Sequence, residues 1–391
     1  MKHYRFFTAI IAILMLIPAQ GQIQTARGKY ATNPMNDIVG LYYGASWRLK
    51  FTPDQLQPYV IHKYVDGHVD WLFPGFTFIE FVNNHQRYFI YKKNDIELNS
   101  ARREDWLWLQ NCLFTKGRDL DGLDKCIDNA IMQLGTPPFR HKVIVNVPTP
   151  IYNHKSWGTL NGKKLNFSKT ADRIAAAKWY IDTFIERFNK AGFRNFDLEG
   201  FVWGDENIRE TDDELVKALA KHIHSKNLRF YWVPYFTSPR AKDWQYFGFD
   251  IAYLQPNHFF HPEVADSRLD EACRRAIEWG MGVEMEFDKR YFTKRNQYQK
   301  RFPAYIDAFE RNQVWEKSAV AYYVDNNAVN LFAADTTRVS DKRVMDRMAQ
   351  HIANRNRMFH ATPAATQPTT QPTSTPSNKP LDWRDPEYWH F

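Results

Sequence analysis

The stretch RNFDLEGFVW (194–203) alternates between two sets of side chains and runs directly into GDE (204–206). A period of two residues is typical of a β-strand, because successive side chains point to opposite faces. One predicted face carries Phe196, Leu198 and Gly200, and the other carries Asp197, Glu199, Phe201 and Trp203. Since helices that cover a sheet need an apolar surface, we expect the face with the two acids to turn away from the helices.

Seven further segments have the character of short buried strands bounded by turn residues. They are 37–43, 71–81, 142–148, 228–236, 249–257, 281–288 and 318–325. Helical periodicity lies between them over 170–192, 211–227, 267–280, 296–313 and 340–358, with less regular helical signals over 102–135. Eight strands that alternate with helices predict an α/β fold, a (β/α)₈ TIM barrel. The alternative is an open doubly wound sheet, but GLYYGAS (40–46) lacks the glycine pattern of a dinucleotide-binding turn.

The two ends of the chain differ from this central region. Residues 1–21 have a basic start (Lys2 and Arg5), an apolar run over 6–17 and small residues before Gln22, which predicts a secretory signal peptide. An uncleaved N-terminal anchor is the alternative. We therefore expect a secreted or periplasmic barrel domain over 22–360, with no stable membrane insertion once the signal is cleaved. A Thr/Pro/Gln-rich linker follows over 361–380, then an aromatic tail over 381–391 that either docks on the barrel or contacts a partner.

Composition narrows the possible functions. The net charge is +8, but basic and acidic residues are mixed along the chain, so no nucleic-acid partner is expected. The 13 Trp, 20 Tyr and 29 Phe suit a large core, and they also suit sugar binding, because a pyranose stacks on a flat ring. Three cysteines make no disulfide framework, although one bridge between Cys112 and Cys126 is possible. The composition leaves the oligomeric state open.

Two acidic strand ends are the candidate catalytic residues. A barrel has its site at the C-terminal ends of its strands, and the fourth and seventh strands face each other across it. A carboxylic acid can protonate a glycosidic oxygen while a carboxylate attacks the anomeric carbon or activates water. We assign Glu206 as general acid/base and Glu286 as nucleophile; Asp205, Glu199 and Glu284 are alternatives for these roles. The structural alternatives are a helix N-terminus for Glu206 and an ion pair with Arg290 for Glu286.

Polar and aromatic residues near the other strand ends are the candidate substrate-binding groups. They are Trp203, Glu199, Tyr235, Gln255, Asn257, His258, Glu284, Tyr323 and Asp325. No cofactor is expected, because the cysteines lack paired spacing, and His222 and His224 lie on different faces of a helix. Calcium or magnesium held by inward carboxylates remains an alternative.

Several of these segments resemble one family in order and spacing. The segments are WLFPGFTFIEF (71–81), LEGFVWGDENI (198–208), FYWVPYF (230–236), FDIAYLQPNHFF (249–260) and GVEMEFD (282–288). Over roughly residues 37–332 they are similar to the secreted bacterial family called domain of unknown function 4855 (DUF4855). The resemblance implies a barrel of the glycoside-hydrolase superfamily type, but it supplies no substrate.

Within this resemblance, Trp203 and Glu206 match an aromatic-then-Glu element, and Glu284 and Glu286 match the acidic seventh strand. Two departures stand out. Pro74 occupies a position where the family usually has Asp, and Glu206 follows Asp205, where other barrel glycosidases commonly have Asn.

The sequence therefore predicts a glycoside hydrolase that acts on a polysaccharide or oligosaccharide by a two-carboxylate, retaining mechanism. Its expected partner is the carbohydrate substrate. The alternative is a non-catalytic glycan-binding or cell-envelope interaction protein, which a barrel fold alone does not exclude. A polysaccharide lyase is a third possibility, but it needs a base and a cation-rich site for an acidic sugar, and the sequence indicates neither.

Overall fold

A closed barrel of eight parallel strands forms the centre of the protein. The computed structural model describes residues 36–92, 96–325, 327–335 and 338–360. The proposed signal peptide (1–21), linker (361–380) and aromatic tail (381–391) lie outside these residues. The strand order around the barrel is β1-β12-β11-β10-β9-β8-β5-β4, and neighbouring strands are parallel throughout. This topology confirms the predicted (β/α)₈ barrel.

The barrel strands coincide with the eight predicted segments. They are β1 (Asp37–Tyr42), β4 (Gly75–Ile79), β5 (His141–Val147), β8 (Phe196–Trp203), β9 (Arg229–Trp232), β10 (Ile251–Leu254), β11 (Gly282–Glu286) and β12 (Val320–Tyr323). The beginning of segment 71–81 instead belongs to a small antiparallel hairpin. That hairpin pairs β2 (Ile61–Lys63) with β3 (Val69–Trp71), and a second one pairs β6 (Thr159–Leu160) with β7 (Lys163–Lys164).

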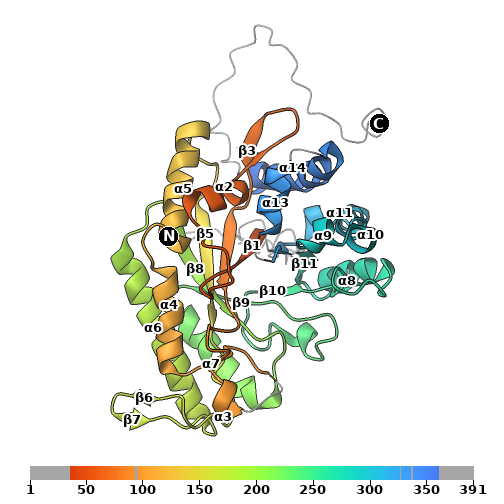
Figure 1. Ribbon diagram of the computed structural model, residues 1–391. Coiled ribbons are helices and arrows are strands. Elements are labelled where there is room, and N and C mark those ends of the chain that lie inside the picture. The colour runs from red at the N-terminus through yellow and green to blue at the C-terminus, as the bar shows by residue number, and fades with distance from the viewer. Residues whose placement is uncertain (1–35, 93–95, 326, 336–337, 361–391) are drawn as a thin grey trace, which may run out of the picture. The chain divides into compact units, whose positions relative to one another are not determined.

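Helices surround the strands (Figure 1). The longer ones are α2 (Pro53–Val60), α4 (Arg103–Leu113), α5 (Asp119–Leu134), α6 (Thr170–Ala191), α7 (Asp213–His224), α8 (Ser267–Glu278), α11 (Arg301–Arg311), α13 (Ala328–Ala334) and α14 (Val339–His360). Short turns are α3 (Ile96–Asn99), η1 (Glu210–Asp212), η2 (Ala241–Asp243), α9 (Arg290–Thr293), α10 (Arg295–Tyr298) and α12 (Val314–Lys317). The helix predicted over 296–313 is thus divided into α10 and α11.

The apolar residues form two separate clusters, which show the two sides of the barrel wall. The larger cluster lies between strands and helices and includes Phe201 and Trp203. The smaller one contains residues of six strands that meet inside the barrel: Ile38, Ile144, Val202, Tyr231, Ile251, Tyr253, Ala319 and Ala321. Side chains therefore occupy the lumen, as in other barrels of this size, and most of this cluster forms the floor of the cavity described below.

A β-bulge in β8 changes which side chains face the lumen. Leu198 pairs with Val143, but the next pair along the two strands is Gly200 with Ile144, so Glu199 is the extra residue. Beyond it the alternation is inverted. Val202 faces the lumen, while Phe201 and Trp203 pack toward the helices. The prediction that Phe201 and Trp203 share a face with Asp197 and Glu199 is therefore wrong.

Gly200 makes this bulge sterically possible. A Cβ at this position would lie 1.9 Å from the carbonyl oxygen of Arg229 on the neighbouring strand. Only a residue without a side chain can occupy such a close approach of two backbones.

Asp197 and Glu199 lie toward the N-terminal end of the barrel. Asp197 pairs with Arg140 and Lys142, each at 2.8 Å, and Glu199 lies 3.3 Å from Arg229 and 3.6 Å from Lys142. The predicted turn of these acids away from the helices is consistent with these partners. Because they are neutralised by nearby cations at the opposite end from the strand C-termini, they stabilise the bottom of the barrel.

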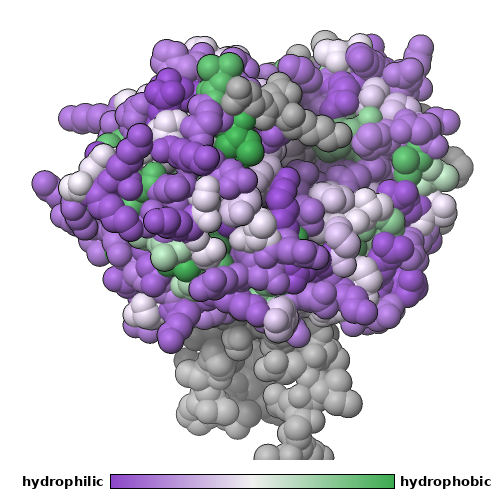
Figure 2. All heavy atoms as spheres, turned by 90° about the horizontal axis from the view of Figure 1, so that it is seen from below, coloured by the Kyte–Doolittle hydropathy of each residue, from purple (hydrophilic) through white to green (hydrophobic). Residues whose placement is uncertain are grey.

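The cysteines and the surface add little to the functional question. Cys112, Cys126 and Cys273 are buried free thiols, so the possible Cys112–Cys126 bridge is not formed. Among the described residues, no helix combines the length and the hydrophobicity needed to span a bilayer. One face of the molecule is mainly hydrophilic, with apolar residues in separate small patches (Figure 2), which is ordinary for a protein surface.

Candidate active site

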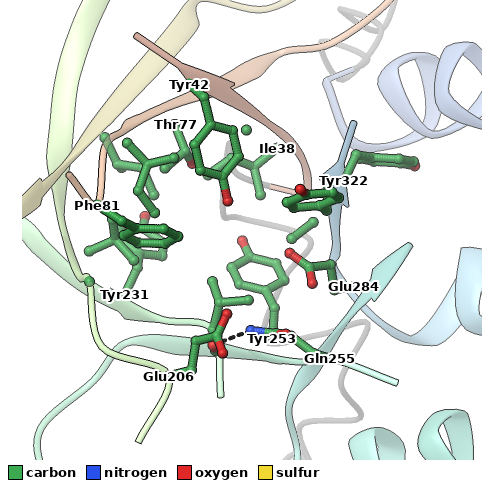
Figure 3. Close-up of a pocket in the computed structure, with 18 of the residues that line it drawn as sticks. Ile38, Tyr42, Thr77, Phe81, Glu206, Tyr231, Tyr253, Gln255, Glu284 and Tyr322 are labelled. Atoms are coloured by element: carbon green, nitrogen blue, oxygen red, sulfur yellow. Dashed lines mark hydrogen bonds between the residues drawn. The ribbon is translucent and has the colours of Figure 1, made fainter. Parts of the chain in front are cut away.

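A cavity of about 450 Å³ opens at the C-terminal ends of the barrel strands. Residues of all eight barrel strands and of the loops that follow them line it (Figure 3). The lining includes Tyr42, Arg48, Phe81, Glu206, Gln255, Asn257, Phe260, Glu284, Arg290 and Tyr323. This is the end at which barrel enzymes have their active sites, and the volume lies in the range of small-molecule sites.

Two carboxyl groups project into this cavity from different walls (Figure 3). Glu206 comes from the loop after β8, and Glu284 comes from the middle of β11. Glu286, which the sequence paired with Glu206, is fully buried and does not line the cavity. The structure thus brings Glu206 together with Glu284, one of the alternatives named from the sequence.

The environment of Glu284 favours its neutral form. The side chain is buried, and no hydrogen-bond donor or cation among the described residues contacts its carboxyl group. Burial raises the pKa of Glu284 well above its ordinary value, and the negative charges of Glu286 and Glu206 raise it further. A buried carboxyl without donors holds its proton at neutral pH.

The environment of Glu206 disfavours ionisation less strongly than that of Glu284. Burial within the cavity raises its pKa, the hydrogen bond donated by Gln255 opposes that rise, and the charges of Asp205 and Glu286 add to it. Its side chain is still accessible to water from the cavity. With one donor where Glu284 has none, Glu206 is the more stable carboxylate of the two pocket groups.

Glu286 is held by donors on all sides. The backbone N–H groups of Asn257, His258 and Phe259 donate to it at 3.1, 2.9 and 3.3 Å, and the Tyr305 hydroxyl donates to it as well. Burial raises the pKa of Glu286, and these four donors oppose the rise. Glu286 therefore fixes the loop between β10 and α8.

The loop that carries Glu206 is fastened by its neighbour Asp205. The Asp205 carboxylate accepts the backbone N–H of Tyr91 at 2.9 Å and lies 3.3 Å from the guanidinium of Arg209. Its carbonyl oxygen accepts the indole N–H of Trp232 at 2.9 Å. Asp205 thereby holds the position from which Glu206 reaches the cavity.

An aromatic strip, defined here as Phe81, Tyr42, Tyr323 and Phe260, forms one wall of the cavity. Its consecutive ring centroids lie 5.7, 5.6 and 5.0 Å apart, all edge to face. A guanidinium stacks at two places along it, with Arg48 4.6 Å from the Tyr42 ring and Arg290 4.7 Å from the Phe260 ring. Flat rings beside hydrogen-bonding groups suit a sugar, which has apolar faces and polar edges.

The guanidinium groups of Arg48 and Arg290 each pair with a carboxylate. Arg48 makes two 2.9 Å bonds to the buried carboxylate of Glu80, and Arg290 binds Asp288 at 2.6 and 2.8 Å. The ion pair suggested between Arg290 and Glu286 is replaced by this pair with Asp288. The cavity wall is therefore polar at these points without a large net positive charge.

The other predicted binding residues divide by position. Gln255, Asn257 and Tyr323 line the cavity, whereas Tyr235, His258 and Asp325 are absent from its lining. Trp203 borders the cavity, but its indole is packed between barrel and helices and only 1% of the residue is exposed. Glu199 lies at the other end of the barrel. His258 is buried, and its side chain contacts Asp266 at 2.8 Å.

Sequence reasoning missed the aromatic strip except for Tyr323, and it missed Arg48. Tyr42 is the last residue of β1, so the rule that chemistry lies at strand ends could have found it. Arg48 and Phe260 lie in loops, where no periodicity indicates direction. Among the described residues, no cluster of three or more His, Cys, Asp or Glu is arranged to hold a metal ion.

We expect the Glu284→Gln variant to be more stable than the parent protein at pH 8 and equally stable at pH 4. A carboxyl whose pKa is raised by folding contributes stability below its unfolded pKa, and that contribution is lost as pH rises through the folded pKa. Glutamine has no charge to bury, so it avoids this loss. Thermal unfolding of both proteins from pH 4 to pH 8 measures the effect, and a stability difference that is the same at every pH would contradict it.

Known proteins place the chain in a family without supplying an activity. The chain resembles solved barrels only distantly. A provisionally named alpha-L-fucosidase from Bacteroides thetaiotaomicron VPI-5482 is 11% identical, with a TM-score of 0.42, over 81% of this chain and 95% of that one. The carboxyl transferase domain of Rhizobium etli pyruvate carboxylase is 9% identical, with a TM-score of 0.39, over 88% of this chain and 53% of that one.

Likenesses at this level carry no argument about function, and no curated protein matches the chain. The model of one family, however, matches residues 37–350, which is most of the sequence. The chain belongs to the family named domain of unknown function DUF4855.

Proposed function

We propose that this protein is a glycoside hydrolase in which Glu284 is the general acid and Glu206 is the base or nucleophile. The observation that carries the proposal is the pair itself. Two carboxyl groups enter one cavity from different walls, neither has a cation partner among the described residues, and only Glu206 receives a hydrogen bond. Glycoside hydrolysis needs one protonated and one ionised carboxyl group in one site.

The roles follow from the donors around each group. Glu284, without donors, keeps the proton that a leaving glycosidic oxygen requires. Glu206, with the Gln255 amide beside it, is available as the carboxylate that stabilises or attacks the anomeric carbon, or that activates water. This assignment replaces the pair of Glu206 and Glu286 expected from the sequence and exchanges the role of Glu206.

The cavity also supports a carbohydrate as the ligand. The aromatic strip offers ring faces, and Gln255 and Asn257 provide amide groups close to the two carboxyls. A non-catalytic glycan-binding protein would be expected to neutralise its pocket acids with Lys or Arg. Instead, the cations at the cavity wall pair with Glu80 and Asp288, and neither Glu206 nor Glu284 has a cation partner among the described residues.

The test is a time course of purified protein with a panel of plant and animal glycans. We expect new reducing ends from at least one glycan, and no release by the Glu206→Gln variant. Proton NMR of the first anomer formed then decides between retention, which the sequence predicts, and inversion. Binding of a glycan by the parent protein without any new reducing ends would overturn the proposal in favour of a binding protein.

A further inference from the structure

The hydrogen bonds behind Glu206 form a chain with a fixed direction. It runs from the backbone of Phe236 through the side chains of Asn257 and Gln255 to Glu206. Amide side chains can be placed in two orientations, so the direction of such a chain normally has to be inferred from its ends. Here two backbone groups, each of which can act in only one way, determine it.

The first of these backbone groups orients Asn257. The N–H of Phe236 can only donate, and it lies 2.7 Å from the side-chain oxygen of Asn257. The amide nitrogen of Asn257 must therefore point the other way, where it lies 3.0 Å from the oxygen of Gln255. The Asn257 backbone is anchored as well, because its N–H donates to Glu286 at 3.1 Å.

The second backbone group orients Gln255. The carbonyl oxygen of Val233 can only accept, and it lies 2.9 Å from the amide nitrogen of Gln255. Both ends of the Gln255 amide are thus determined independently. Its remaining N–H points at the carboxyl group of Glu206 (Figure 3). Gln255 can donate to Glu206 but cannot accept a proton from it.

Given the proposed hydrolase function, on which this role rests, we propose that Gln255 is a positioning residue that determines which pocket carboxyl carries the proton. By donating only, it keeps Glu206 as the carboxylate and leaves the proton on Glu284. A hydrogen bond to a charged group is strong enough to decide between two neighbouring carboxyls that share one proton.

The other titratable and charged groups near Glu206 and Glu284 do not replace this bias. They are Asp205 on the same loop, Glu284 and Glu286 on β11, and Tyr42 on β1, with Arg48 and Arg290 on the cavity wall. Asp205 and Glu286 are acids that oppose ionisation of Glu206. The two arginines are already bound to other carboxylates. Gln255 is the hydrogen-bond donor to Glu206 among the described residues.

The test replaces Gln255 by methionine, which has similar length and no donor. Carbon NMR of protein labelled at the glutamate side-chain carboxyl carbon follows each group directly, with signals assigned from Glu206→Gln and Glu284→Gln. In Gln255→Met we expect Glu206 to titrate at higher pH and Glu284 at lower pH than in the parent. In a hydrolase assay, kcat/KM on the acidic side of the optimum should fall about tenfold relative to the optimum.

Two further variants make the result specific. Asn257→Gly removes the donor to Gln255 without adding a charge, and glycine tolerates the positive φ of 49° at this position, so this variant should shift both titrations in the same directions by a smaller amount. Gln110→Met removes a buried amide that donates to the Tyr180 carbonyl on α6, at 3.0 Å, away from the cavity, and it should shift neither titration. Circular dichroism confirms that each variant is folded.

The outcomes separate this role from the proposed function. Unchanged titrations of Glu206 and Glu284 in a folded Gln255→Met protein would overturn the role of Gln255, even if the protein hydrolyses glycans. Shifted titrations in a protein that cleaves no glycan would support the role of Gln255 and overturn the hydrolase function. Should Gln255→Met fail to fold, the same titrations in Asn257→Gly decide, and no shift there contradicts the proposal.

Discussion

Glu284→Gln and Glu206→Gln should each lower kcat/KM on an unactivated glycan by about 10²–10⁴-fold, the usual contribution of a positioned acid or base. The two variants should differ on an aryl glycoside whose phenolate leaves without protonation. Glu284→Gln should keep most of its activity there, because the acid is no longer needed. Glu206→Gln should remain inactive, and added azide should restore turnover if Glu206 acts as the nucleophile.

Two controls make this comparison decisive. Glu104→Gln changes an exposed glutamate on α4, with 65% of its side chain accessible, and should leave the rate unchanged. Glu286→Gln should lower the melting temperature. Only the oxygen of a glutamine amide accepts hydrogen bonds, so it cannot accept all four donors that surround Glu286. Full activity of Glu284→Gln on the unactivated glycan would show that this carboxyl is not the acid.

Arg355→Met should destabilise the protein by about 3–5 kcal/mol, the usual cost of leaving one partner of a buried ion pair alone. Arg355 on α14 binds the fully buried Asp37 of β1 at 2.7 Å. It also donates to the carbonyl oxygens of Asn36 and Ser318, each at 2.9 Å. These residues precede β1 and β12, so one side chain from the last helix joins the first and last strands of the barrel.

The matched control lies two residues further along the same helix. Arg357 pairs with Asp70 at 2.7 Å, but 54% of its side chain is exposed, and exposed pairs contribute about 0–1 kcal/mol. Urea unfolding of both variants measures the difference. The double variant Asp37→Asn with Arg355→Met should recover part of the loss, because no charge is left buried. Equal costs for Arg355→Met and Arg357→Met would contradict this anchoring.

The barrel itself could be predicted because its strands are short, apolar and bounded by turn residues. Each of 142–148, 249–257 and 281–288 contains a strand that is buried on both faces, as parallel strands covered by helices must be. Closure of the sheet then follows from the number of strands and the helices between them. The signals are local, and they survive in the sequence.

The site could be predicted only in part. The sequence identifies both Glu206 and Glu284 as candidate catalytic residues, because each lies on or just after one of the two acidic strands, β8 and β11. The sequence favours Glu286 over Glu284, because Glu286 is nearer the strand end. What distinguishes the two residues of β11 is their surroundings: four donors from the loop after β10 and from α11 contact Glu286, and none of the described residues donates to Glu284. Those donors are 19 to 29 residues away in the chain.

The sequence by itself determined the eight strands, the barrel and the end of it at which acids gather, because periodicity and turn residues act over a few neighbours. Only the tertiary structure decided the direction of Trp203 and the division of labour among the acids. The bulge at Glu199 depends on the register with β5, and the close approach at Gly200 depends on β9. The ionisation of each carboxyl depends on donors and charges that folding brings to it, and no local pattern in the sequence records them.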